Sequence, residues 1–132
     1  MTTVQGEAPV ERIEGIYLDT LTPESASQGW GELQRNQSVW EKPIVIAGKR
    51  FRRGLGTHAP SQIIYKLTPG QYRRFQAWAG ADNATTPSVN FEVWLDGKKA
   101  WESGLITNAD PARRVDLDIS GVKTLQLRVG DG

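Results

Sequence analysis

Polar and apolar residues alternate along much of this chain, a pattern typical of β-strands with one buried face. The alternation is clearest in four segments, residues 72–80, 88–95, 115–119 and 125–129. In the first of them, the apolar face holds Phe75, Ala77 and Ala79. Almost no segment repeats its apolar residues with the 3.6-residue period of a helix. The pattern therefore predicts an all-β domain.

Turn dipeptides separate these segments. Asp96-Gly97 is the strongest hairpin signal in the chain, and Ala47-Gly48 or Gly48-Lys49 supplies the bend of a second hairpin over residues 43–51. Together the segments and turns indicate about seven or eight short strands, a spacing typical of a two-sheet sandwich or jelly roll.

Residues 17–41 are less regular. Thr22 and Pro23 resemble the start of a helix, but Gly29 and Gly31 would end any helix within two turns. We therefore expect a loop here, with one helical turn at Thr22–Pro23.

Composition and charge limit the classes of partner. The 132 residues are 38% hydrophobic, enough for one domain with a core. Lysine and arginine number 16 against 15 acidic residues, so the net charge of +1 gives no argument for nucleic acid or an anionic membrane as a partner. The absence of cysteine excludes disulfides and thiolate metal sites.

The N-terminal residues show no targeting signal. Residues 1–9 lack the basic start and apolar middle of a secretion signal, and no apolar run is long enough to span a bilayer. We expect residues 1–14 to be a linker or the start of a cloned fragment, followed by one domain over residues 15–132.

The single histidine lies in an unusual loop, Gly-Leu-Gly-Thr-His-Ala-Pro-Ser over residues 54–61. Gly54 and Gly56 accept backbone angles that other residues avoid, and Pro60 fixes its own φ. The apolar run that follows predicts a strand, so the loop is expected at the end of a sheet. Two interpretations of His58 stay open, a ligand contact and a hydrogen bond to a neighbouring carbonyl group.

Two tryptophans lie opposite the apolar faces of their predicted strands. If adjacent strands bring Trp78 and Trp94 together, the pair forms a secondary aromatic patch for a glycan or a neighbouring domain. Alternatively, both faces of the sheet are covered and both indoles belong to the core.

Several short motifs together resemble one family. In chain order they are Tyr17-Leu18-Asp19, Gly29-Trp30-Gly31, Asn36-Gln37-Ser38, Ile46-Ala47-Gly48-Lys49, Gly54-Leu55-Gly56-Thr57-His58-Ala59, Gly80-Ala81-Asp82, Val89-Asn90-Phe91-Glu92-Val93, Asp96-Gly97-Lys98, Val115-Asp116, Leu125-Gln126-Leu127 and Gly130-Asp131-Gly132. From about residue 15 onward, the chain is similar to the NPCBM family, also classified as carbohydrate-binding module family 51. The resemblance implies a galactose-binding-like jelly-roll sandwich that recognises a terminal galactose-like sugar. It also implies an accessory domain of a bacterial glycoside hydrolase, outside the cell or in its envelope.

The resemblance also implies a sugar site. A neutral sugar needs an aromatic face for its C–H groups and hydrogen-bonding groups for its hydroxyls. His58 and Asn36 would bind hydroxyls, and Trp30 would supply the aromatic face. Trp30 has the alternative role of a plug that closes the core between two glycines, and Asn36 that of a partner for the loop backbone.

Calcium is a further expectation, from similarity to calcium-containing sandwich modules. The candidate ligands are Asp82 with Asn83, and Asp19 or Asp131. Asp and Asn are also ordinary turn formers, so the spacing leaves both interpretations open.

One departure from the family concerns the C-terminal end. Members usually continue past Gly130-Asp131-Gly132 into an Asp-His-Ala-Asp-Trp-like motif and a closing strand. If that strand normally lies inside a sheet, its loss exposes unpaired backbone, so strand exchange between copies or a dimer is expected.

Catalysis is not expected. Two carboxylates suffice for glycoside hydrolysis, and the pairs that could be nominated are Asp116 with Asp118 and Glu92 with Asp96. No glycine-framed nucleophile, second histidine or metal triad accompanies them, so surface ion pairs are the favoured interpretation. The alternative function is a structural module that docks against a catalytic domain of a glycoside hydrolase without binding sugar.

Overall fold

The computed structural model describes residues 2–4, 15–82 and 88–131. These residues form twelve strands and one 3-10 turn: β1 (Thr2–Val4), η1 (Leu18–Thr20), β2 (Ser25–Gln28), β3 (Gln34–Arg35), β4 (Ile44–Ile46), β5 (Lys49–Phe51), β6 (Leu55–Gly56), β7 (Ser61–Lys66), β8 (Arg74–Gly80), β9 (Val89–Leu95), β10 (Lys98–Ile106), β11 (Arg113–Asp118) and β12 (Thr124–Asp131). No helix in this part of the chain is long and apolar enough to cross a membrane.

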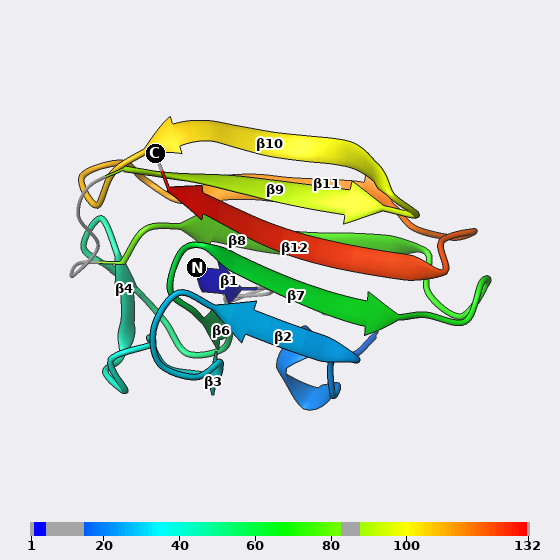
Figure 1. The fold of residues 1–132 in the computed structure, drawn as a ribbon, viewed down its shortest axis with the longest axis horizontal. Helices are drawn as coiled ribbons and strands as arrows, with labels where there is room; N and C mark the ends of the chain where they lie inside the picture. Colours follow the sequence, from blue (N-terminus) through cyan, green and yellow to red (C-terminus); the bar gives the residue numbers. More distant parts are fainter. Residues whose placement is uncertain (1, 5–14, 83–87, 132) are drawn as a thin grey trace.

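Two five-stranded antiparallel sheets form a sandwich (Figure 1). One sheet has the order β11-β8-β1-β6-β3, and the other has the order β10-β9-β12-β7-β2. The predicted all-β sandwich is therefore confirmed.

The core follows from the alternation in sequence. Phe75, Ala77 and Ala79 of β8 are buried and belong to the same apolar cluster as Phe91 of β9 and Leu127 of β12. Burying one face of each sheet against the other removes this apolar area from water and stabilises the sandwich.

Both predicted hairpins are present. Asp96 and Gly97 have φ of 50° and 80° between β9 and β10, and Ala47 and Gly48 have φ of 49° and 83° between β4 and β5. Positive φ at both central residues matches the right-handed twist of the flanking strands. The β4–β5 hairpin forms a two-stranded sheet of its own and buries a second, smaller apolar cluster of Ile44, Ile46 and Phe51.

Two segments differ from expectation. The helical turn predicted at Thr22–Pro23 lies earlier, at Leu18–Thr20, and Ser25–Gln28 forms a strand that pairs with β7. Backbone pairing at the sheet edge outweighs the local helix-start signal here. Within the segment expected to be a linker, Thr2–Val4 forms a strand between β8 and β6.

Candidate functional site

Three loops form the candidate site. They follow β2, β3 and β6, and they include residues 29–31, 36–42 and 57–60. Because β2 belongs to one sheet and β3 and β6 to the other, the site joins the two layers at the lower left of Figure 1. The loop with His58 lies directly before β7, so its predicted place at the end of a sheet is confirmed.

An exposed aromatic cluster lies on these loops. The ring centroids of Trp30 and Trp40 are 4.4 Å apart, and the ring planes meet at 32°. His58 lies 6.3 Å from Trp30 and 6.2 Å from Trp40, measured between ring centroids. Trp30 is 51% exposed and Trp40 is 41% exposed, so the interpretation of Trp30 as a core plug is wrong. We call Trp30, Trp40 and His58 the aromatic cluster.

Close backbone approach positions Trp30. A Cβ atom on Gly29 would lie 2.4 Å from the carbonyl oxygen of Ala59 and 2.7 Å from Cδ of Pro60, so only glycine fits. The Gly29 N–H donates to the carbonyl of His58 at 3.0 Å. This contact holds the Trp30 loop directly against the His58 loop.

A closed turn positions Trp40. The buried Ser38 hydroxyl accepts hydrogen bonds from the backbone N–H groups of Trp40 and Lys42, both at 3.3 Å. The backbone of Ser38 also donates to the carbonyl of Lys42 at 2.8 Å and accepts from the N–H of Glu41 at 2.9 Å. The indole of Trp40 therefore projects from a backbone that is fixed on both sides.

His58 has one ring nitrogen engaged. Its Nδ1 lies 2.6 Å from the carbonyl oxygen of Ala59. A carbonyl oxygen only accepts, so Nδ1 carries the proton and Nε2 of the neutral imidazole is an acceptor. The bond to a neighbouring carbonyl is thus present, and the second nitrogen keeps the capacity to accept a hydrogen bond from a hydroxyl.

Asn36 has a structural role in the geometry. The Asn36 side-chain Oδ1 accepts a hydrogen bond from the Gly54 N–H at 3.0 Å, and the backbone N–H of Asn36 donates to the Gly54 carbonyl at 2.7 Å. Gly54 precedes His58 by four residues, whereas the aromatic cluster gathers around His58 itself. The structure therefore brings Trp40 beside Trp30 and His58, and it places Asn36 beside Gly54. Trp40 was not among the predicted sugar-binding residues, although it lies in the same irregular, tryptophan-containing segment as Trp30.

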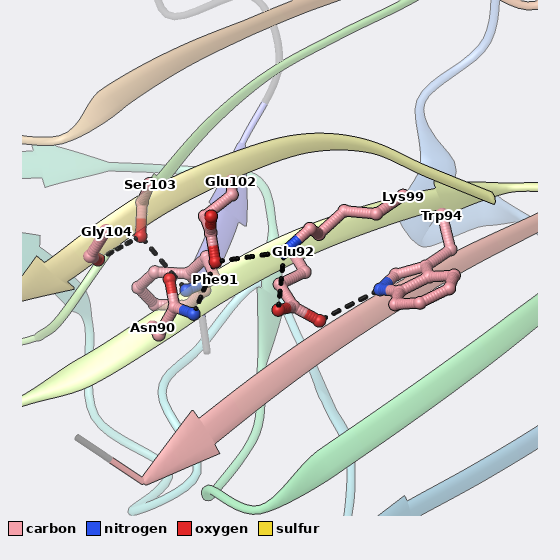
Figure 2. Close-up of polar contacts among 8 residues, drawn as sticks. All are labelled: Asn90, Phe91, Glu92, Trp94, Lys99, Glu102, Ser103 and Gly104. Atoms are coloured by element: carbon pink, nitrogen blue, oxygen red, sulfur yellow. Dashed lines mark hydrogen bonds and ion pairs between the residues drawn. The ribbon is translucent and has the colours of Figure 1, made fainter.

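Trp78 and Trp94 do not form a pair. Trp78 lies on β8 of one sheet, and Trp94 lies on β9 of the other, so the interpretation that adjacent strands bring them together as an aromatic patch is wrong. Both are half-buried. Trp94 Nε1 donates to Glu92 at 2.9 Å, as Figure 2 shows.

The expected calcium ligands are dispersed. Asp19 is buried and its carboxylate accepts from Arg53 at 2.8 and 3.3 Å, which occupies both oxygens. Asp131 is exposed at the end of β12, Asp82 is buried just after β8, and Asn83 lies outside the described residues. Within the described ranges, no group of three or more histidine, cysteine or acidic side chains could hold a metal ion. The Asp19 carboxylate is thus engaged by Arg53, and the calcium site, with Asp82, Asn83, Asp19 and Asp131 as candidate ligands, stays a prediction.

The nominated carboxylate pairs are committed to hydrogen bonds. Asp116 accepts from Arg74 Nε at 2.7 Å, and Asp118 accepts from the backbone and hydroxyl of Ser120. These bonds lower the pKa of both carboxyls. Asp96 accepts from the backbone of Lys123 and Thr124, and Glu92 accepts from Trp94. A general acid needs a raised pKa, so Asp116 with Asp118 does not resemble a hydrolytic pair.

Comparisons with known proteins agree with the fold. The model of the NPCBM/NEW2 domain family matches residues 14–132. The structure of CBM51 from Clostridium perfringens GH95, in complex with methyl-galactose, has a TM-score of 0.82 and 37% identity, and the match covers 89% of this chain and 87% of that one. CBM51-2 of Clostridium perfringens ZmpB, in complex with GlcNAc, has a TM-score of 0.78 and 28% identity over 86% of this chain and 26% of that one.

A longer relative is similar over one part only. A Renibacterium salmoninarum protein that carries the name of an endo-alpha-N-acetylgalactosaminidase is 28% identical over 111 residues, which is 78% of this chain. The match spans 7% of the length of that relative. A domain of this kind therefore occurs within a much longer glycosidase-related protein.

Proposed function

The chain belongs to the NPCBM/NEW2 domain family, and from this premise we propose that it is a non-catalytic carbohydrate-binding module. Its ligand is a terminal galactose-like sugar, which binds at the aromatic cluster. The observation behind this proposal is the exposed Trp30–Trp40 pair beside the acceptor nitrogen of His58.

The chemistry of the cluster suits a neutral sugar. The axial 4-hydroxyl of galactose leaves one face of the ring with a continuous patch of C–H groups, which packs against an indole face. His58 Nε2 then accepts a hydrogen bond from a sugar hydroxyl. The solved complex of the 37% identical CBM51 with methyl-galactose supports the choice of sugar.

The same premise supports a setting for the module. We infer that it is attached in cis to a glycoside hydrolase, outside the cell or in its envelope, and that it holds the enzyme at its glycan. The match to a short part of a much longer glycosidase-related relative supports this inference.

Titration calorimetry with methyl-galactoside tests the function. Trp30→Ala, Trp40→Ala and His58→Ala are each expected to weaken binding about tenfold or more, because each removes a direct contact. Leu105→Ala is the matched control, since Leu105 is 66% exposed on β10. Methyl-glucoside, with its equatorial 4-hydroxyl, is expected to bind more weakly.

Two outcomes contradict the proposal. Unchanged affinity in folded variants of the cluster removes the site assignment. A silent glycan array, together with a tight interface to a catalytic domain, supports the structural-module alternative instead.

A further inference from the structure

Two positive charges lie close to the ring of Trp78. Trp78 is half-buried on β8, where its ring packs against the Ile44–Ile46–Phe51 cluster of the β4–β5 hairpin. Lys49 Nζ lies 5.8 Å from the centroid of the Trp78 ring, and Arg114 Cζ lies 5.6 Å from it. Arg114 is directly opposite Trp78 in the β11–β8 register, and both cationic side chains are exposed. We call Trp78, Lys49 and Arg114 the cationic patch.

The two charges of this patch are poorly neutralised. Among the described residues, no acidic group lies within ion-pair distance of Lys49. Asp116 lies 4.0 Å from Arg114, but its stronger bond goes to Arg74 at 2.7 Å. Asp118, the next acidic residue on β11, accepts from Ser120. The guanidinium and ammonium groups therefore keep donors for an external anion.

Trp94, which is half-buried on β9, differs from Trp78 because acidic groups accompany its cations. Arg128 Cζ lies 4.1 Å from the centroid of the Trp94 ring, and Glu92 accepts from the Trp94 indole. Lys99, in the same network, pairs with Glu92 at 3.7 Å and with Glu102 at 3.3 Å (Figure 2). Cations and acids balance at Trp94, whereas the cations at Trp78 have no such balance.

We propose that the cationic patch is a second binding site, for a saccharide that bears a carboxylate or sulfate group. The accessible part of the Trp78 indole packs against the C–H groups of the sugar ring, and Lys49 and Arg114 bind its anionic group. The site lies on β8, β11 and the β4–β5 hairpin, and it shares no residue with the aromatic cluster. It goes beyond the proposed recognition of neutral galactose.

The test uses the Trp30→Ala/Trp40→Ala variant, in which the aromatic cluster is disabled. Lactose, 3′-sialyllactose and 3′-sulfolactose are titrated while the indole resonance of Trp78 is followed by NMR. The resonance is expected to shift with at least one anionic sugar and to stay in place with lactose. The sialyl and sulfo arms separate a carboxylate ligand from a sulfate ligand. Raising the salt concentration is expected to weaken the binding.

Charge variants complete the test. In the same background, Lys49→Gln/Arg114→Gln is expected to weaken binding of the anionic sugar about tenfold or more. Lys98→Gln/Lys123→Gln removes the same charge from exposed positions next to β9 and β12 and is expected to leave binding unchanged. Equal affinity of the two double variants overturns the proposal. Tighter binding of hexaglutamate than of either anionic sugar also overturns it, in favour of an acidic protein segment.

These outcomes are independent of the proposed galactose site. Loss of that function would appear as absent methyl-galactoside binding by the unchanged protein, and the shift at Trp78 would persist. Loss of the second site would leave the methyl-galactoside titration as it is.

Discussion

Replacing Gly29 by alanine tests whether backbone contact builds the aromatic cluster. The added methyl group would lie 2.4 Å from the Ala59 carbonyl oxygen, and ordinary contact begins at 3.4 Å, so the two loops must separate by about 3.4 − 2.4 = 1.0 Å. Neither the carbonyl nor the adjacent Pro60 ring can rotate away. Overpacking of this kind costs about 1–3 kcal/mol. The melting temperature of a domain of this size falls roughly 3–4 °C for each kcal/mol.

The same displacement moves Trp30 away from His58. It strains the hydrogen bond from the Gly29 N–H to the His58 carbonyl, which now measures 3.0 Å. We therefore expect Gly29→Ala to weaken methyl-galactoside binding about tenfold, which corresponds to about 1.4 kcal/mol. Calorimetry measures the affinity, and thermal denaturation followed by circular dichroism measures the stability.

Gly121→Ala is the matched control. A Cβ atom on Gly121 meets nothing within 4 Å, and its φ is outside the left-handed region. Alanine there is expected to keep both the affinity and the stability, or to raise stability slightly by restricting the unfolded chain. If Gly29→Ala and Gly121→Ala have the same affinity and the same stability, close backbone approach at Gly29 does not build the aromatic cluster.

Three other measurements test particular residues. Tyr65→Phe is expected to keep stability at neutral pH, because the buried Tyr65 hydroxyl has no hydrogen-bond partner among the described residues. Burial raises the pKa of Tyr65 to about 12, above its ordinary pKa of 10.0. The stability contributed by the protonated Tyr65 side chain is therefore complete below pH 10.0 and is lost as the pH rises toward 12. Alkaline unfolding should spare Tyr65→Phe over this range. The hydrogen bond from Arg74 lowers the pKa of Asp116, so the stability from this pair is present above the ordinary value of 3.8 and is lost as the pH falls through the lower folded value. An NMR titration should place the Asp116 midpoint below 3.8 and should show it rise in Arg74→Gln. If Asp82 anchors calcium, EDTA lowers the melting temperature and Asp82→Asn removes this effect, whereas a melting temperature indifferent to EDTA contradicts the calcium prediction.

Local patterns predicted the core and the hairpins well. The alternation of Phe75, Ala77 and Ala79 determines which face of β8 is buried, and Asp96-Gly97 determines where the chain reverses. Each of these signals depends on residues that are close together in sequence. The sequence pattern is therefore sufficient to predict the buried face of a strand and the position of a hairpin.

The same patterns could not assign strands to sheets. A period of two residues places Trp78 and Trp94 on the outer faces of their strands, but it does not say which sheet each strand joins. That choice depends on pairings between distant segments, such as β8 with β11 and β9 with β12. For this reason the sequence could not decide between a tryptophan pair and two separate tryptophans.

Distant partners also decided the roles of single polar residues. Asn36 and Gly54 are 18 residues apart, and Asp19 and Arg53 are 34 residues apart. In each case the partner engages side-chain oxygens that were also candidates for binding a sugar or a calcium ion. No local motif marks either contact, so the sequence pattern could not predict them.

The aromatic cluster has its shape before any ligand arrives. The ring centroids of Trp30 and Trp40 already lie 4.4 Å apart in a tilted arrangement, and the backbones of both residues are fixed by contacts of Gly29 and Ser38. A neutral sugar gains little from electrostatic attraction, so it binds more tightly when fewer side chains and loops have to be ordered on binding. Gly56 contributes to the same order, because a Cβ atom there would lie 2.2 Å from the Gln37 carbonyl oxygen and would push away the segment that leads to Trp40. The glycines of this region therefore support recognition through the backbone, without any contact of their own to the sugar.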